Sequence, residues 1–68
     1  MLELKRENNK TFKEFFTGTN GHKTVNCILD DNCVRYIVFE GLRVKSRREF
    51  DNSKKDLCFK NATKALNK

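Results

Sequence analysis

The sequence contains no proline and only three glycines, and it has no long hydrophobic run. The longest apolar stretch covers residues 36–39, whereas a membrane-spanning helix needs roughly 18 apolar residues. The N-terminal residues lack the apolar core of a secretory signal. No repeat, low-complexity tract or linker divides the chain. We therefore expect one domain over residues 1–68, in an intracellular protein of the nucleus or cytoplasm, without a membrane partner.

Cysteine is scarce and odd in number, which favours reduced thiols over a disulfide framework in a chain without a secretory signal. Together with His22, the cysteines have the composition of a zinc site. Their spacing, H-x4-C-x5-C-x24-C, lacks the closely paired ligands of common zinc modules. No third orienting group or glycine-rich oxyanion loop accompanies these residues, which argues against nucleophilic catalysis. We predict no metal, no cofactor and no enzymatic activity.

Acidic residues are in the minority, with nine Asp and Glu against fifteen Lys and Arg, which gives a net charge of +6 and an isoelectric point near 9.5. Such a balance favours polyanionic partners. Residues 43–55 hold six basic and two acidic residues, so +4 of the net charge lies in this stretch. The alternative to a binding site here is an ordinary solvated surface. The six basic residues are Arg43, Lys45, Arg47, Arg48, Lys54 and Lys55.

Residues 11–16 form the first segment with a clear pattern. Thr11 and Glu14 have the spacing of a capping box, and the segment's three phenylalanines have helical spacing. These features predict a short helix that ends in the glycine-containing loop of residues 17–21. The competing interpretation is a hairpin that turns at residues 8–9.

Residues 24–29 and 33–40 are rich in β-branched and aromatic residues, and turn-forming residues separate them. This pattern predicts a hairpin. A turn centred on residues 31–32 places six residues on one face, which would form the core. Residues 42–47 alternate apolar and basic residues and predict a third strand with a cationic outer face. The paired core residues are Val25 with Val38, Cys27 with Tyr36, and Leu29 with Val34.

The last segment predicts a helix from about residue 54 to residue 66. Ser53 and Asp56 have capping spacing at its start. Its apolar arc is centred on Cys58, so we expect this thiol to be buried, as we do Cys27. The predicted element order is therefore α-β-β-β-α, an α+β fold. The arc consists of Leu57, Cys58, Ala62, Ala65 and Leu66.

The motif Ser53-Lys54-Lys55-Asp56-Leu57, followed by an Ala-rich, Leu-ending stretch, resembles the opening of the last helix in the double-stranded-RNA-binding domain family. Residues 12–15, Phe-Lys-Glu-Phe, are similar to part of that family's first helix. The resemblance implies a three-stranded antiparallel sheet with two helices packed on one face. It also implies a non-enzymatic module that binds double-stranded or structured RNA by shape.

The resemblance implies RNA contacts on both helices. At the start of the last helix, Ser53, Lys54 and Lys55 would form a cationic tip for phosphates, because helix N-termini attract anions. On the first helix, Glu14 would accept hydrogen bonds from 2′-hydroxyl groups and Lys13 would contact the sugar–phosphate backbone. An additional basic patch would strengthen the attraction: Arg43, Lys45, Arg47 and Arg48.

Departures from the family pattern keep other functions open. The family's Gly-Pro-x-His loop is replaced by residues 30–32, where Asp30 and Asp31 would repel phosphate, and Cys58 replaces the third lysine of the motif. The alternative is a protein–protein interaction module with weak or no RNA binding, whose partner contacts the sheet face or the Asp30–Asp31 turn. A further alternative is DNA binding through the sheet, where Arg35 and Ile37 would share the outer face.

Overall fold

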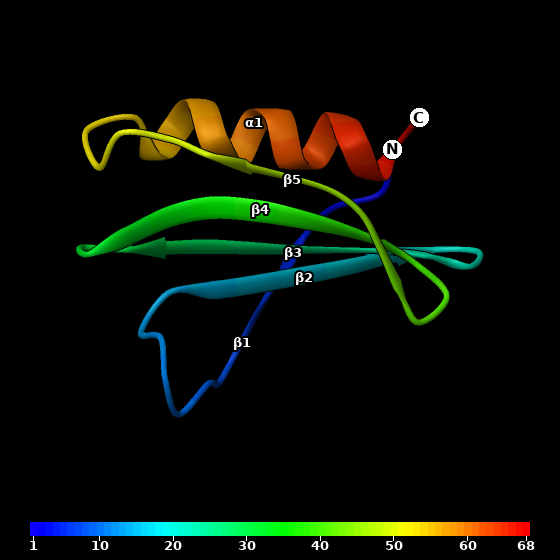
Figure 1. The fold of residues 1–68 in the computed structure, drawn as a ribbon, viewed down its shortest axis with the longest axis horizontal. Coiled ribbons are helices and arrows are strands. Elements are labelled where there is room, and N and C mark those ends of the chain that lie inside the picture. The colour runs from blue at the N-terminus through cyan, green and yellow to red at the C-terminus, as the bar shows by residue number, and fades with distance from the viewer.

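The structure, a computed structural model, describes residues 1–68 as one antiparallel sheet of five strands followed by a single helix. The strands follow one another in chain order, and α1 lies across one face of the sheet (Figure 1). The predicted α-β-β-β-α order, with three strands and two helices on one face, is therefore wrong. The elements are β1 Lys5–Glu7, β2 Phe15–Asn20, β3 Lys23–Asp30, β4 Cys33–Glu40, β5 Arg43–Glu49 and α1 Lys55–Leu66.

The first predicted helix is replaced by the strands β1 and β2. Phe15 pairs with Glu7 on one side and with Ile28 on the other, so β2 gains two hydrogen-bonded neighbours. A helix of residues 11–16 alone is too short to be stable without such partners. The side chain of Asn9 accepts hydrogen bonds from the backbone N–H groups of residues 11 and 12, at 2.8 and 3.0 Å, which fixes a turn. The competing interpretation, a hairpin that turns near residues 8–9, describes this region better.

The central hairpin has the predicted register. Leu29 pairs with Val34, Cys27 with Tyr36, and Val25 with Val38. The hairpins on either side turn at Gly21 and Gly41, whose φ angles are 64° and 62°. A glycine with positive φ at the first of two turn positions is typical of the tight turns whose twist matches that of the strands.

The third predicted strand is present as β5, which forms one edge of the sheet and is exposed along its whole length. Ser46 pairs with Val38 and Val44 with Phe39, so Lys45 is an extra residue in a β-bulge. Edge strands expose unpaired backbone groups, and bulges and basic side chains both discourage pairing with another chain.

The core lies between α1 and strands β2 to β4. Cys58, Ala62 and Leu66 from the helix are fully buried, whereas Leu57, also placed in the predicted arc, is 44% exposed. A Cβ on Gly18 would lie 2.7 Å from a Leu66 methyl group, so the absence of a side chain there lets the helix approach β2. The helix is too short and too polar to cross a lipid bilayer.

The predicted burial of Cys27 and Cys58 is confirmed. Both are free thiols with no exposed surface, and their sulfur atoms lie 4.0 Å apart. Burial raises the pKa of each thiol, which keeps both in the unreactive protonated form.

We expect a maleimide reagent to modify Cys33, which is only half-buried, well before the other two cysteines under native conditions. Mass spectrometry of the partly labelled protein measures the order. Equally rapid labelling of all three cysteines would contradict the packing of α1 on β3.

Candidate nucleic-acid interface

The predicted cationic tip lies at the start of α1. Lys54 is the N-cap residue, and no side chain caps the helix. The hydroxyl of Ser53 donates to the carboxylate of Asp51 at 3.1 Å, so it does not serve as the predicted cap. Lys54 is exposed and forms no ion pair, whereas Lys55 is only half-exposed. Of the two predicted phosphate contacts, only Lys54 is free.

Lys55 is held by two carboxylates from distant parts of the chain. Its Nζ lies 3.0 Å from an oxygen of Asp31, in the β3–β4 turn, and 3.7 Å from an oxygen of Glu14. The side chain of Asn52 also donates to the carbonyl of Asp31 at 2.6 Å, which fixes the turn beside the helix start. The hydrogen bond and the charge of Lys55 hold the pKa of the Asp31 carboxyl below its usual range, and the pKa of Lys55 is raised in turn. Lys55 therefore links α1 to the β3–β4 turn and to the segment just before β2.

We expect a Lys55→Met variant to restore the pKa of Asp31 toward its ordinary value of 3.8. A depressed carboxyl pKa stabilises the folded state above the ordinary value, and that stabilisation is lost as the pH falls below it. The variant should therefore lose less stability than the parent on acidification through this window. NMR titration of the Asp31 carboxyl carbon measures the pKa. Lys54→Met is the matched control and should leave it depressed; an unchanged pKa in Lys55→Met would contradict the ion pair.

Lys13 and Glu14, predicted on a helix, lie instead in the segment between β1 and β2. Lys13 is exposed, and its carbonyl accepts a hydrogen bond from Arg6 at 3.1 Å. The carbonyl of Glu14 accepts from the N–H of Leu29 at 2.9 Å, and its side chain faces Lys55. The structure thus brings Glu14 and Lys55 together as an ion pair, whereas the resemblance placed them on two separate helices.

The predicted basic patch is divided by β5 between two faces of the sheet. Arg47 pairs with Ile37 on the face opposite α1, which we call the helix-free face. Arg48 pairs with Tyr36 on the α1 side, and its guanidinium lies 4.9 Å from the ring centre of Phe50. Lys45, on the bulge, forms an exposed ion pair with Glu40 at 3.2 Å, and Arg43 lies at the strand's first position. All four residues are exposed, but they do not form one surface.

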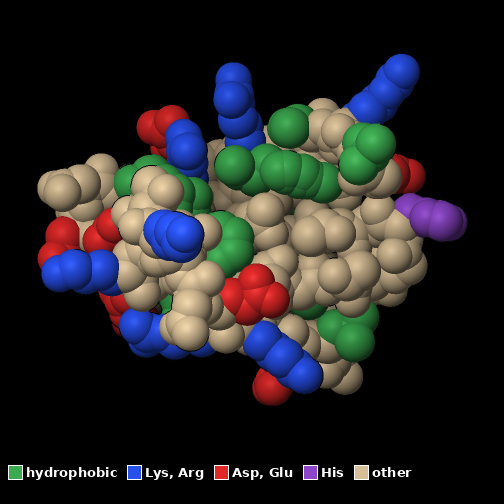
Figure 2. All heavy atoms as spheres, turned by 90° about the horizontal axis from the view of Figure 1, so that it is seen from below, with side chains coloured by type: hydrophobic (Ala, Val, Ile, Leu, Met, Phe, Trp, Pro, Cys, Tyr) green, Lys and Arg blue, Asp and Glu red, His purple; other side chains and the backbone are tan.

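Two adjacent rows of the helix-free face contain no acidic residue. One row runs from Lys5 through β2, β3 and β4 to Arg47, and the other begins at Thr19 and ends at Val44. Figure 2 views the molecule from below, opposite the helix of Figure 1, and shows hydrophobic side chains grouped beside polar atoms, with most of the Lys and Arg near the rim and both basic and acidic side chains toward the left and lower middle of the view. We call the rows from β2 to β5 the sheet platform: Thr17, Thr19, Thr24, Asn26, Ile37, Phe39, Val44 and Arg47.

The platform combines an aromatic ring, amide and hydroxyl groups, and the cation Arg47, and one of its rows continues to Lys5 on β1. Phe39 is half-exposed and lies outside the buried core. The hydroxyl of Thr17 donates to Oδ1 of Asn26 at 2.7 Å, which leaves the Asn26 NH₂ group without a protein partner. Arg35, one row further along β4, has a buried Nε that also lacks a partner.

Sequence reasoning missed this surface because it assigned Phe15 to Thr19 to a helix and a loop. Only once β2 joins the sheet do Thr17 and Thr19 extend the helix-free face beyond the central hairpin. The alternation of residues 35, 37 and 39 on β4 was the signal that could have located it, because residues two apart in a strand share a face.

Comparison with protein-family models, with curated proteins and with solved structures gives no match. No group of three or more His, Cys, Asp or Glu side chains comes together in a way that could hold a metal ion. The assignment of function therefore depends on the chemistry of the surfaces described above.

Proposed function

We propose that this protein is a nucleic-acid-binding module that binds single-stranded RNA or DNA across the sheet platform. The observation that carries the proposal is the pair of acid-free rows: Phe39 lies between Thr24 and Val44 in one row, and the adjacent row ends in Lys5 and Arg47. Bases stack on aromatic rings, and phosphates bind nearby cations, so this combination suits an unpaired strand. The net charge of +6 adds general attraction to a polyanion.

Single strands fit the platform better than a duplex does. A duplex keeps its base faces stacked inside, so Phe39 would have no base to contact. The duplex-reading arrangement expected from the sequence also needs two helices on one face, whereas the chain has one helix. The amide of Asn26 and the threonine hydroxyls can bond to base edges or sugars of any sequence, so weak sequence preference is expected.

Binding of double-stranded RNA at the helix end is a second candidate, and one observation favours it. Lys54 is exposed and unpaired beside the free backbone N–H groups at the start of α1, where a phosphate would be attracted. Lys55 would contribute little, because Asp31 and Glu14 already neutralise its charge.

A titration with four labelled oligonucleotides tests the proposal. Single-stranded RNA and DNA of one mixed sequence, about 15 nucleotides long to cover the platform, are compared with their duplexes over a range of salt concentrations. We expect both single strands to bind more tightly than either duplex, by roughly tenfold, because only they offer free base faces. Measurable binding should persist at moderate salt, since stacking does not depend on counterion release.

Three outcomes would count against the platform. A preference for duplex RNA would favour the helix end as the site. Equal binding of all four oligonucleotides that vanishes as the salt rises would indicate generic charge attraction. No binding even at low salt would leave a protein partner as the better proposal.

A further inference from the structure

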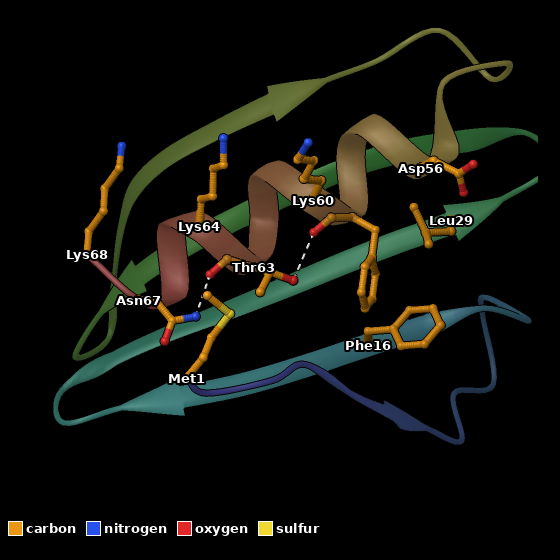
Figure 3. A pocket seen from close by; sticks show the side chains of 10 residues that line it. Met1, Phe16, Leu29, Asp56, Lys60, Thr63, Lys64, Asn67 and Lys68 are labelled. Atoms are coloured by element: carbon orange, nitrogen blue, oxygen red, sulfur yellow. Dashed lines mark hydrogen bonds between the residues drawn. The ribbon is translucent and has the colours of Figure 1, made fainter.

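A second surface feature lies on the opposite side of the sheet, between α1 and β2. Because the helix packs mainly on β3 and β4, it leaves a groove of about 880 Å³ beside β2. The rings of Phe16 and Phe59 form its floor, edge to face with centroids 5.1 Å apart, and Leu29 and Met1 extend the apolar lining. Figure 3 shows Phe16 and Leu29 toward one end of the groove and Met1 beside Asn67 toward the other. The nucleic-acid proposal makes no use of this groove.

Hydrogen bonds close one end of the groove. The backbone N–H of Leu2 donates to Oδ1 of Asn67 at 2.8 Å, and Nδ2 of Asn67 donates back to the carbonyl of Leu2 at 2.9 Å. Leu2 is thereby fixed against the last turn of α1, and Met1, at the rim of the groove, stays fully exposed. The hydroxyl of Thr63 is already bonded to the carbonyl of Phe59 at 3.0 Å, so the helix wall offers few free polar groups to the interior.

The charged residues around the groove are mostly basic. Lys60 and Lys64 on α1, and Lys68 just after it, are exposed and form no ion pair, and their side chains extend on the side away from Phe16 (Figure 3). Residues four apart on a helix lie on the same face, so Lys60 and Lys64 form a cationic ridge above the apolar floor. The one acidic lining residue, Asp56, lies in the first turn, one helical turn before Lys60.

We propose that the groove binds an anionic amphiphile, a free fatty acid, with its alkyl chain on Phe16 and Phe59 and its carboxylate beside Lys60 and Lys64. Apolar lining supplies the affinity for the chain, and the few charged groups at the rim orient the ligand. Asp56 repels the carboxylate from the first turn, which sets the direction of the bound chain. A second copy of this protein is disfavoured as the occupant, because the lysine ridges of two copies would repel each other.

Titration with dodecanoate below its micelle concentration tests the proposal, followed by calorimetry and by amide chemical shifts. We expect saturable binding at one site, with shifts confined to α1 and β2, and much weaker binding of the uncharged methyl ester. Lys60→Glu combined with Lys64→Glu should weaken dodecanoate binding by about tenfold, because two favourable charges become unfavourable. Both lysines are exposed, so the variant should stay folded.

Two further variants make the test specific. Lys10→Glu combined with Lys54→Glu produces the same change in net charge outside the groove and should bind dodecanoate like the parent. Thr63→Trp places a bulky side chain in the groove without removing core atoms, and should abolish binding while circular dichroism shows the fold intact.

Several results would overturn the proposal. One is the absence of saturable dodecanoate binding by the parent protein. Another is an equal loss of dodecanoate affinity in the groove variant, Lys60→Glu with Lys64→Glu, and in the control variant, Lys10→Glu with Lys54→Glu. Binding only to vesicles of acidic phospholipid, and not to monomeric dodecanoate, would indicate surface attraction. Sedimentation showing a dimer that Thr63→Trp dissociates would identify a second copy as the occupant.

Discussion

A Leu66→Ala variant is expected to lose about 2–5 kcal/mol of unfolding free energy, the cost of emptying a fully packed core position. Leu66 is completely buried and is the largest fully buried side chain of the chain. It packs against the backbone of β2 at Gly18, so the cavity would lie where the helix joins the sheet. Native domains are stable by only about 5–15 kcal/mol, and one this small is near the low end, so much of the population should unfold at 37 °C.

Urea denaturation followed by circular dichroism measures the change. Leu57→Ala is the matched control, because Leu57 lies on the same helix but is 44% exposed, and it should cost far less. If α1 packed on the sheet through Leu57 instead of Leu66, Leu57→Ala would cost more unfolding free energy than Leu66→Ala. Equal effects of the two substitutions would contradict the burial of Leu66.

Phe39→Ala is expected to lower the affinity for single-stranded nucleic acid by roughly 5- to 150-fold, since stacking of one base on an aromatic ring contributes about 1–3 kcal/mol. Phe39 lies outside the core cluster and on the helix-free face, so the sheet should survive the change. Retention of the parent's affinity would show that bases do not stack on the platform.

Two substitutions at the same position separate the ring from its apolar surface. Phe39→Tyr keeps an aromatic face and should bind nearly as well as the parent, whereas Phe39→Leu keeps apolar bulk and should bind as weakly as Phe39→Ala. Arg47→Ala should reduce the dependence of log K on log salt by about one, because one phosphate contact is lost. Fluorescence anisotropy measures each affinity, and thermal unfolding confirms that each variant is folded.

The parts of the fold that were predictable are those decided by local chemistry. Asp31 and Asn32 form the predicted turn, and the alternating pattern on either side of it sets the register of β3 and β4. The last helix was also predictable, because its apolar residues recur at helical spacing and end at Leu66.

The N-terminal third was not predictable from spacing. Phe12, Phe15 and Phe16 fit a helix, but the same residues are good strand formers, and long-range pairing with Ile28 and Cys27 decided the outcome. This error carried over to the site. Without β2 in the sheet, Glu14 was assigned to RNA contact, whereas it lies beside Lys55. Both rows of the platform also lacked their β2 residues, Thr17 and Thr19.

Amide chemical-shift mapping shows which residues contact the nucleic acid, and so tests whether a single strand binds across the helix-free face. A single-stranded oligonucleotide is added to isotope-labelled protein until the signals stop changing. We expect the largest shifts on β4 and β5 around Ile37, Phe39, Val44 and Arg47, with small shifts on α1. Shifts concentrated around Lys54 and Lys55 at the start of α1, with the sheet platform unchanged, would contradict it.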